Sequence, residues 1–191
     1  MFGHKRIPSR EGGVEVVVSM LASRMAALGH EVTCYNRGGR KTVWENVTVK
    51  AVPTLRIKGI SAVTASFFAA IAASFSMAEV VHIHAEGPAF MSFIPKLFRK
   101  KLIVTVHGLD WQRAKWKNGF AAKFIRFGEK MAVRYADEII VLSRHMQKYF
   151  MDTYGRETVY IPNAVPKPEV LPIDMAKERF GLEGDGYILF A

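Results

Sequence analysis

Three histidines stand at or next to the ends of apolar runs. His82 and His84 lie two apart in the run VVHIH, and His107 directly follows the run LIVTV. Residues two apart on a strand share one face, so these imidazoles could gather as nitrogen ligands for a metal ion. No cysteine or carboxylate cluster accompanies them, and we predict no metal site. We interpret His82 as a buried group with a hydrogen-bond partner, and we expect His84 and Glu86 to face a cleft.

The segment HGLDW, which begins at His107, leads out of a buried-looking strand. An imidazole at the end of a parallel strand points into the crevice at that edge of the sheet. Gly108 permits a sharp turn, and Asp110 can either cap the next segment or accept a hydrogen bond from a ligand hydroxyl. For both His107 and Asp110, a purely structural role is the alternative to ligand binding.

A pair of glycines, Gly12 and Gly13, precedes the first long helical pattern. Glycines let a backbone approach a ligand closely, and the free N–H groups at the start of a helix favour a phosphate. The pair is neither the six-residue dinucleotide fingerprint nor a Walker loop. A plain tight turn is therefore the alternative reading.

Basic residues gather in the middle of the chain. Lys and Arg number 27 against 17 acids, and residues 95–135 hold eleven basic and two acidic side chains. Such a patch suits an anionic partner. With Trp116 nearby, one helical stripe predicts contact with an anionic membrane surface; a solvated helix face is the alternative. The stripe consists of Lys123, Arg126, Lys130 and Arg134. No helix-turn-helix, zinc finger or RNA-binding aromatic signature is present, so we predict no nucleic-acid partner.

These residues need a scaffold, and the chain alternates short β-branched runs with longer helical patterns. Strands are predicted over residues 31–36, 47–52, 80–84, 102–106, 138–142 and 158–161. Helices are predicted over 14–28, 61–76, 89–98, 120–135, 144–151 and 175–180, and a further strand over 186–191. The alternation indicates an α/β fold with a doubly wound, Rossmann-like parallel sheet, whose carboxyl edge would bring the loops described above together.

The 191 residues are enough for one core and the start of a second domain. We predict a Rossmann-like domain over 1–161 with a truncated first strand, a proline-rich linker over 162–172 and the beginning of another domain over 173–191. Residues 60–78 carry no charge but are rich in Ala, Ser and Thr, which favours a packed helix over a membrane span. The single cysteine and the lack of a secretory start indicate a reducing cytoplasm, with peripheral contact on the inner face of the cell membrane as an extension of the basic-patch prediction.

Five segments in chain order resemble the N-terminal domain of family 4 glycosyltransferases of the GT-B fold, especially bacterial enzymes of cell-surface polysaccharide assembly. They are IPSREGGVEVVV, VVHIHAEGP, VTVHGLDWQRAKW, KMAVRYADEIIVLS and VYIPNAV. The resemblance runs over about residues 2–165. One departure is Asn163-Ala164, where the family usually has Asn-Gly.

The resemblance implies a hexosyltransferase-type enzyme that moves a sugar from a nucleotide-sugar to an acceptor hydroxyl with retention of configuration, without a metal or another cofactor. Gly12 and Gly13 would lie against the donor diphosphate, and His107 would contact the transferred sugar at the reacting centre. Arg10, Glu86 and Asp110 would lie on the side of the acceptor, a glycan or lipid-linked molecule. Most donor contacts belong to the family's C-terminal domain, so we expect this chain alone to be inactive.

A different class of function competes with this one. The chain could be a non-catalytic module that holds an anionic glycan or a membrane surface through its basic patch. A salt titration separates the two, because purely electrostatic binding weakens steeply with salt. A nucleotide-sugar epimerase or dehydrogenase is disfavoured, because the dinucleotide glycine fingerprint is missing.

Overall fold

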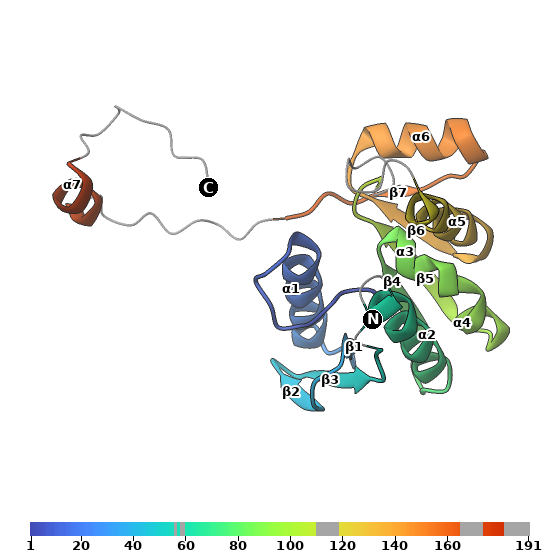
Figure 1. Cartoon of the computed structure of the whole chain (residues 1–191), viewed down its shortest axis with the longest axis horizontal. Helices are drawn as coiled ribbons and strands as arrows, with labels where there is room; N and C mark the ends of the chain where they lie inside the picture. The colour runs from blue at the N-terminus through green and yellow to red at the C-terminus, as the bar shows by residue number, and fades with distance from the viewer. Residues whose placement is uncertain (56, 58–59, 110–118, 165–173, 182–191) are drawn as a thin grey trace.

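The computed structural model describes residues 1–55, 57, 60–109, 119–164 and 174–181 (Figure 1). Two groups of strands form its centre. Four strands pair in parallel, in the order β4 (Val80–His84), β5 (Lys101–Val106), β6 (Glu138–Val141) and β7 (Val159–Tyr160). The other group has the order β1 (Thr33–Arg37), β3 (Val47–Val52) and β2 (Thr42–Trp44), with β1 parallel and β2 antiparallel to β3.

The first residues of the chain join the two groups of strands. The N–H of Phe2 donates to the carbonyl of His82 at 3.1 Å, and the carbonyl of Phe2 accepts from the N–H of His84 at 2.9 Å. On the other side, the carbonyl of Met1 accepts from the N–H of Tyr35 at 3.0 Å. Met1 and Phe2 therefore take the place of a central strand, and the strand order reverses there. In an open α/β sheet, such a reversal marks the crevice where ligands bind.

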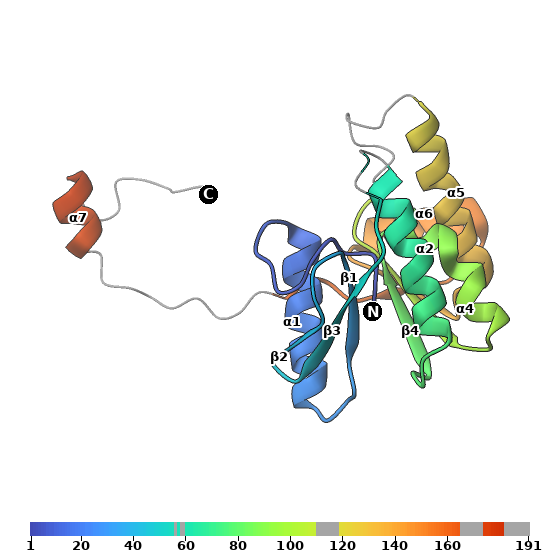
Figure 2. The same cartoon turned by 60° about the horizontal axis from the view of Figure 1, so that its bottom comes forward.

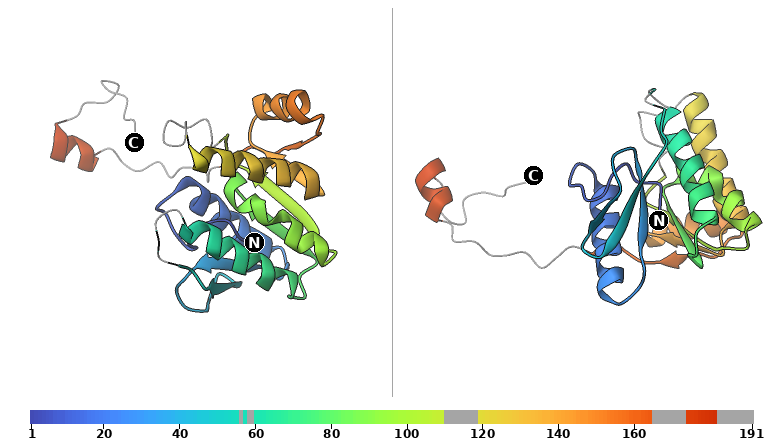
Figure 3. Two further views of the ribbon diagram at one scale, coloured as in Figure 1. Left: turned by 45° about the vertical axis from the view of Figure 1, so that its right-hand side comes forward. Right: turned by 90° about the horizontal axis from the view of Figure 1, so that it is seen from below.

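Helices cover both faces of the sheet, as the doubly wound prediction requires. Figures 2 and 3 show α1 (Gly13–Ala27) on one side and three helices on the other: α2 (Ile60–Ser74), α4 (Phe93–Leu97) and α5 (Phe120–Tyr135). α6 (Arg144–Tyr154) joins the larger core through Met146 and Phe150. The smaller core packs Val18 and Ala22 of α1 onto the strands. The parallel α/β fold is thus confirmed, and the buried apolar residues form two cores.

Three local features differ from the predictions. β2 was not expected; it forms a hairpin with β3 through Glu45 and Asn46, which both have positive φ angles suited to a tight turn. The helix expected over 89–98 is divided into α3 (Glu86–Ala89), a 3-10 turn over Phe90–Ser92 and α4. Pro95 lacks an N–H to donate, and this interrupts a continuous helix.

The third difference is the length of α6, which reaches Tyr154 and ends at Gly155 in a left-handed conformation. Beyond the main domain the structure describes α7 (Asp174–Phe180), where a helix over 175–180 was predicted. The strand predicted over 186–191 lies outside the described residues. The division into domains stays a prediction.

Candidate functional site

The polar residues gather at the carboxyl edge of the sheet, beside the reversal of strand order. Gly3 and His4 follow the Met1–Phe2 segment, Glu86 follows β4, and His107 follows β5. Two backbone features hold these loops together. Gly3 has a φ of +112°, and a Cβ there would lie 2.1 Å from the carbonyl oxygen of His84, so the approach requires glycine.

The second backbone feature is the turn at Ala85, which has a φ of +77° although it is not a glycine. Its N–H donates to the carbonyl of Thr105 at 2.9 Å, which ties the end of β4 to β5. Left-handed backbone at a residue with a side chain persists only where its surroundings enforce it, and such positions concentrate at functional sites.

The histidines pair across neighbouring strands. His84 Nδ1 lies 3.3 Å from His107 Nε2, and the rings of His82 and His84 have centroids 4.2 Å apart. His82 Nε2 lies 2.7 Å from the Thr105 hydroxyl, which supports its interpretation as a buried, hydrogen-bonded group. On the other side of the Met1–Phe2 segment, His4 Nε2 lies 3.0 Å from Asn36 Oδ1.

These imidazoles are uncharged at neutral pH. Burial lowers the pKa of His4 to about 4 and that of His82 to about 3. Burial is also the main reason that the pKa of His84 falls well below its ordinary value, and its histidine neighbours lower it further. The pKa of His107 is lowered by burial as well, and the charge of Glu15 opposes that change in part. These four rings therefore offer neutral nitrogen donors and acceptors.

The start of α1 faces the same edge. Gly12 precedes the helix and Gly13 is exposed, and no described residue has an atom within 4 Å of the place where the Cβ of Gly13 would be. The carboxylate of Glu15 folds back over Gly12 and accepts the N–H of Lys5 at 2.9 Å. Its negative charge suits the first turn of a helix. This end of α1 thus has open backbone on one side and a carboxylate on the other.

Comparison with known proteins identifies the family of the chain. The model of the family described as Glycosyltransferase Family 4 matches residues 11–167. The chain belongs to this family. Among solved structures, the chain is similar to sucrose-phosphate synthase from Thermosynechococcus elongatus, with a TM-score of 0.67 and 16% identity over 91% of this chain. It spans 48% of that structure, about half its length. No curated protein matches the chain.

The family 4 chain thus has the fold of a GT-B glycosyltransferase domain, as the sequence predicted. None of the helices that the structure describes has both the length and the apolar character needed to cross a bilayer. Within the same described residues, no group of three or more His, Cys, Asp and Glu side chains could hold a metal ion. Metal independence stays a prediction.

Some of the predicted site residues of this family 4 chain are exposed and others are buried. Arg10 is exposed in the loop before α1, and His107 is partly exposed. His84 and Glu86, in contrast, are 1% and 0% exposed, so the expectation that they face an open cleft is wrong for this chain. α5 packs closely against the loop at Glu86, because a Cβ on Gly128 would lie 2.1 Å from the carbonyl oxygen of Glu86. A substrate contact for Glu86 stays a prediction.

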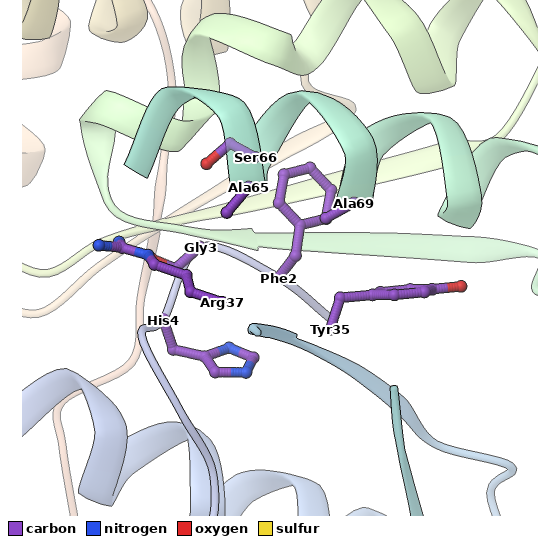
Figure 4. A pocket seen from close by; sticks show the side chains of 8 residues that line it. All are labelled: Phe2, Gly3, His4, Tyr35, Arg37, Ala65, Ser66 and Ala69. Carbon is purple, nitrogen blue, oxygen red and sulfur yellow. The ribbon is translucent and has the colours of Figure 1, made fainter. Parts of the chain in front are cut away.

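Other predicted residues fall elsewhere. Asp110 and Trp116 lie outside the described residues. The four basic residues of α5 are all exposed, whereas Ile125, Glu129 and Ala132 of the same helix are buried. A small hollow lies between the Met1–Phe2 segment and α2, and its lining includes Gly3, Arg37 and Ser66 (Figure 4). None of the residues predicted to bind substrate lines it.

The sequence predicts no role for Glu15, His4 or Asn36, which lie at this edge in the structure. Glu15 had a signal, since it stands in the first helical turn directly after the glycine pair. His4 and Asn36 had none, because they lie 32 residues apart and meet only when Met1 and Phe2 enter the sheet.

Proposed function

We propose that this chain is the N-terminal, acceptor-side domain of a retaining, hexosyl-transferring enzyme of polysaccharide or glycolipid biosynthesis. In the reaction, the bond between the anomeric carbon and the diphosphate oxygen of a nucleotide-sugar breaks. The acceptor oxygen bonds to the same face of that carbon, and the acceptor proton passes to the leaving phosphate. The proposal involves no metal or other cofactor.

The observation that carries this proposal is the convergence of His107 and the start of α1 on one sheet edge, in a chain of a glycosyltransferase family. A leaving diphosphate needs charge stabilisation, which fixed N–H groups at a helix start can supply. Gly12 and Gly13 fill this role in the proposal. His107 contacts the transferred sugar, with Arg10, Glu86 and Asp110 on the acceptor side.

The donor is held mainly by a second domain in this proposal, with residues 1–161 as the acceptor domain, 162–172 as the linker and 173–191 as the beginning of the donor domain. The structural relative, of which the chain spans 48%, supports a longer protein. Closure of two domains around the sugar would keep water from the reacting centre.

The direct test is sugar transfer from a panel of nucleotide-sugars. We expect none from the 191-residue chain alone, and transfer with retention from a protein that carries both domains. Reading the gene on both sides of this chain comes first, because it shows whether a second domain follows. Transfer by the isolated chain would contradict the division of roles, and transfer with inversion would contradict the reaction.

A sharper test uses Gly13→Ala in the two-domain protein. A Cβ at Gly13 meets no atom within 4 Å in the described part of the chain, so the substitution should not destabilise the domain. If the diphosphate rests against this backbone, the added methyl group raises the KM for the nucleotide-sugar by about tenfold or more, which corresponds to ~1.4 kcal/mol. Arg24→Ala, at the exposed far end of α1, is the matched control and should leave the KM unchanged. An unchanged KM for Gly13→Ala would remove Gly13 from the donor site.

A second candidate function is peripheral attachment to an anionic membrane surface, with or without catalysis. The exposed stripe on α5, formed by Lys123, Arg126, Lys130 and Arg134, favours it. Changing all four residues to Glu should abolish binding to vesicles that contain phosphatidylglycerol. The control changes four exposed basic residues elsewhere to Glu: Arg6, Arg24, Arg40 and Lys41. Equal losses in both variants would show attraction by net charge alone, and unchanged binding in the first would reject the α5 surface.

A further inference from the structure

We propose that His84 fixes His107 in the neutral form that carries its proton on Nδ1, so that His107 acts toward the substrate as a hydrogen-bond donor and not as a base. His84 would be a positioning residue for the reaction. The identity of the substrate rests on the function proposed above, whereas the placement of the protons rests on the histidines themselves.

The rings of His84 and His107 are in contact. His84 Nδ1 and His107 Nε2 lie 3.3 Å apart, within hydrogen-bonding distance. Burial lowers the pKa of both rings, so both are neutral at physiological pH. Each neutral imidazole has one N–H donor and one bare nitrogen acceptor. One of the two facing nitrogens therefore donates and the other accepts.

The other nitrogen of His84, Nε2, shows which of the two rings is the donor. His84 is 1% exposed, and no group in the described part of the chain lies within hydrogen-bonding reach of its Nε2. A proton on Nε2 would be a buried N–H without an acceptor, which folded proteins rarely contain. A bare acceptor nitrogen is tolerated more readily. The proton of His84 therefore sits on Nδ1 and is donated to His107 Nε2.

His4 provides an independent check that a buried ring nitrogen without a partner carries no proton. Its Nε2 faces Asn36 Oδ1, an oxygen that can only accept. The orientation of that amide is fixed by Ile7, whose N–H donates to Oδ1 at 3.0 Å and whose carbonyl accepts from Nδ2 at 2.9 Å. His4 Nε2 must therefore donate. The nitrogen that has no partner among the described residues, Nδ1, is the bare one, as we infer for Nε2 of His84.

This hydrogen bond determines which nitrogen of His107 carries the proton. Its Nε2 accepts from His84 and cannot at the same time take a proton from a substrate. Its own proton is on Nδ1, on a partly exposed ring at the carboxyl edge of the sheet. An N–H there can donate to a sugar hydroxyl oxygen or to an oxygen of the leaving phosphate. Besides one another, the charged and titratable groups that act on these rings are His82, His4, Glu15 and the N-terminal ammonium group of Met1.

The test is ¹H–¹⁵N two-bond correlation NMR of the ¹⁵N-labelled chain, which shows the protonated nitrogen of each neutral imidazole. We expect the proton on Nδ1 for His84 and His107, and on Nε2 for His4, which serves as the internal reference. A wild-type spectrum with the His107 proton on Nε2 would overturn the proposal, and this result needs no variant and no substrate.

Variants separate positioning from packing. His84→Asn keeps an amide where the Nδ1 side of the ring was, so the His107 pattern should be retained. His84→Leu cannot donate, so His107 should shift to a mixture of both protonated forms. His82→Leu is the control, because its ring makes its hydrogen bond to Thr105 instead, and it should leave His107 unchanged. An unchanged His107 in a folded His84→Leu protein would reject the role of His84. If these proton positions are found but the two-domain protein transfers no sugar, the result would contradict the proposed function alone.

Discussion

Two buried polar networks in this domain are built in opposite ways. Between α5 and α6, the carboxylate of Glu129 accepts hydrogen bonds from the hydroxyls of Tyr149, at 2.9 Å, and Tyr154. At the sheet edge, His4, His82 and His84 each make one side-chain hydrogen bond, and the structure shows no described partner for Nδ1 of His4 or Nε2 of His84. In the helix network, around Glu129, one carboxylate accepts hydrogen bonds from two hydroxyls. In the edge network, formed by the histidines, two ring nitrogens have no described partner.

The difference indicates what each network is for. A carboxylate that accepts from hydroxyls on a neighbouring helix fixes one packing arrangement and gives a ligand nothing to bind. Neutral imidazoles with one hydrogen bond each keep directional polar atoms in a dry environment, where electrostatic contacts to a substrate are strong. The two networks also carry opposite pH signatures, which allow each to be perturbed alone.

Acid should break the edge network first, with the largest effect. The pKa of His4 is lowered to about 4 and that of His82 to about 3, below the value of ~6.5 for the unfolded chain. The unfolded state therefore binds more protons below that value, so stability is full above ~6.5 and is lost as the pH falls toward 4. Each such histidine should lower the free energy of unfolding by up to about 1.4 kcal/mol per pH unit.

Urea unfolding between pH 7 and pH 5 measures this slope. His82→Leu should reduce the slope by the amount that corresponds to about one proton, because the variant lacks one imidazole that binds a proton only in the unfolded state. An identical slope in the variant would show that the acid sensitivity arises elsewhere.

Removing the acceptor of the helix network should have the next largest effect. Glu129→Leu leaves the hydroxyls of Tyr149 and Tyr154 without their carboxylate, and we expect a loss of about 3 kcal/mol in the free energy of unfolding. Glu129→Gln keeps an acceptor oxygen and should lose less. Chemical denaturation measures both. Because the edge network is separate, the acid slope should be the same in both variants.

Alkali should weaken the helix network and leave the histidines untouched. Burial and the neighbouring Glu129 raise the pKa of Tyr149 to about 12, and that of Tyr154 is raised by the same causes. A raised pKa means stability that is full below the unfolded value of ~10 and is lost as the pH climbs toward 12. Both rings are partly exposed, so solvent reduces the effect below that of acid. Absorbance of tyrosinate during unfolding follows it, and Glu129→Gln should lower the midpoint of the Tyr149 titration.

The two networks also differ in how far the sequence reveals them. The order of strands and helices follows from residue periodicity, and His107 follows from its place at the end of an apolar run. The partners of Glu129 could not be predicted, because Tyr149 and Tyr154 lie 20 and 25 residues away on a helix whose contact with α5 is set by packing. The burial of Glu86 was missed for a similar reason, since it depends on Gly128 admitting the α5 backbone.

The smallest effect should come from a single edge contact. Thr105→Val replaces the hydroxyl that lies 2.7 Å from His82 Nε2 with a methyl group of similar shape. Thr105 is buried, so no water replaces the lost partner, and we expect a loss of about 1–2 kcal/mol in the free energy of unfolding. The proton position of His107 should not change, because its hydrogen bond goes to His84 and not to His82. A larger loss together with an altered His107 spectrum would mean that the histidines act as one coupled unit, and the edge would then be as closed as the network around Glu129.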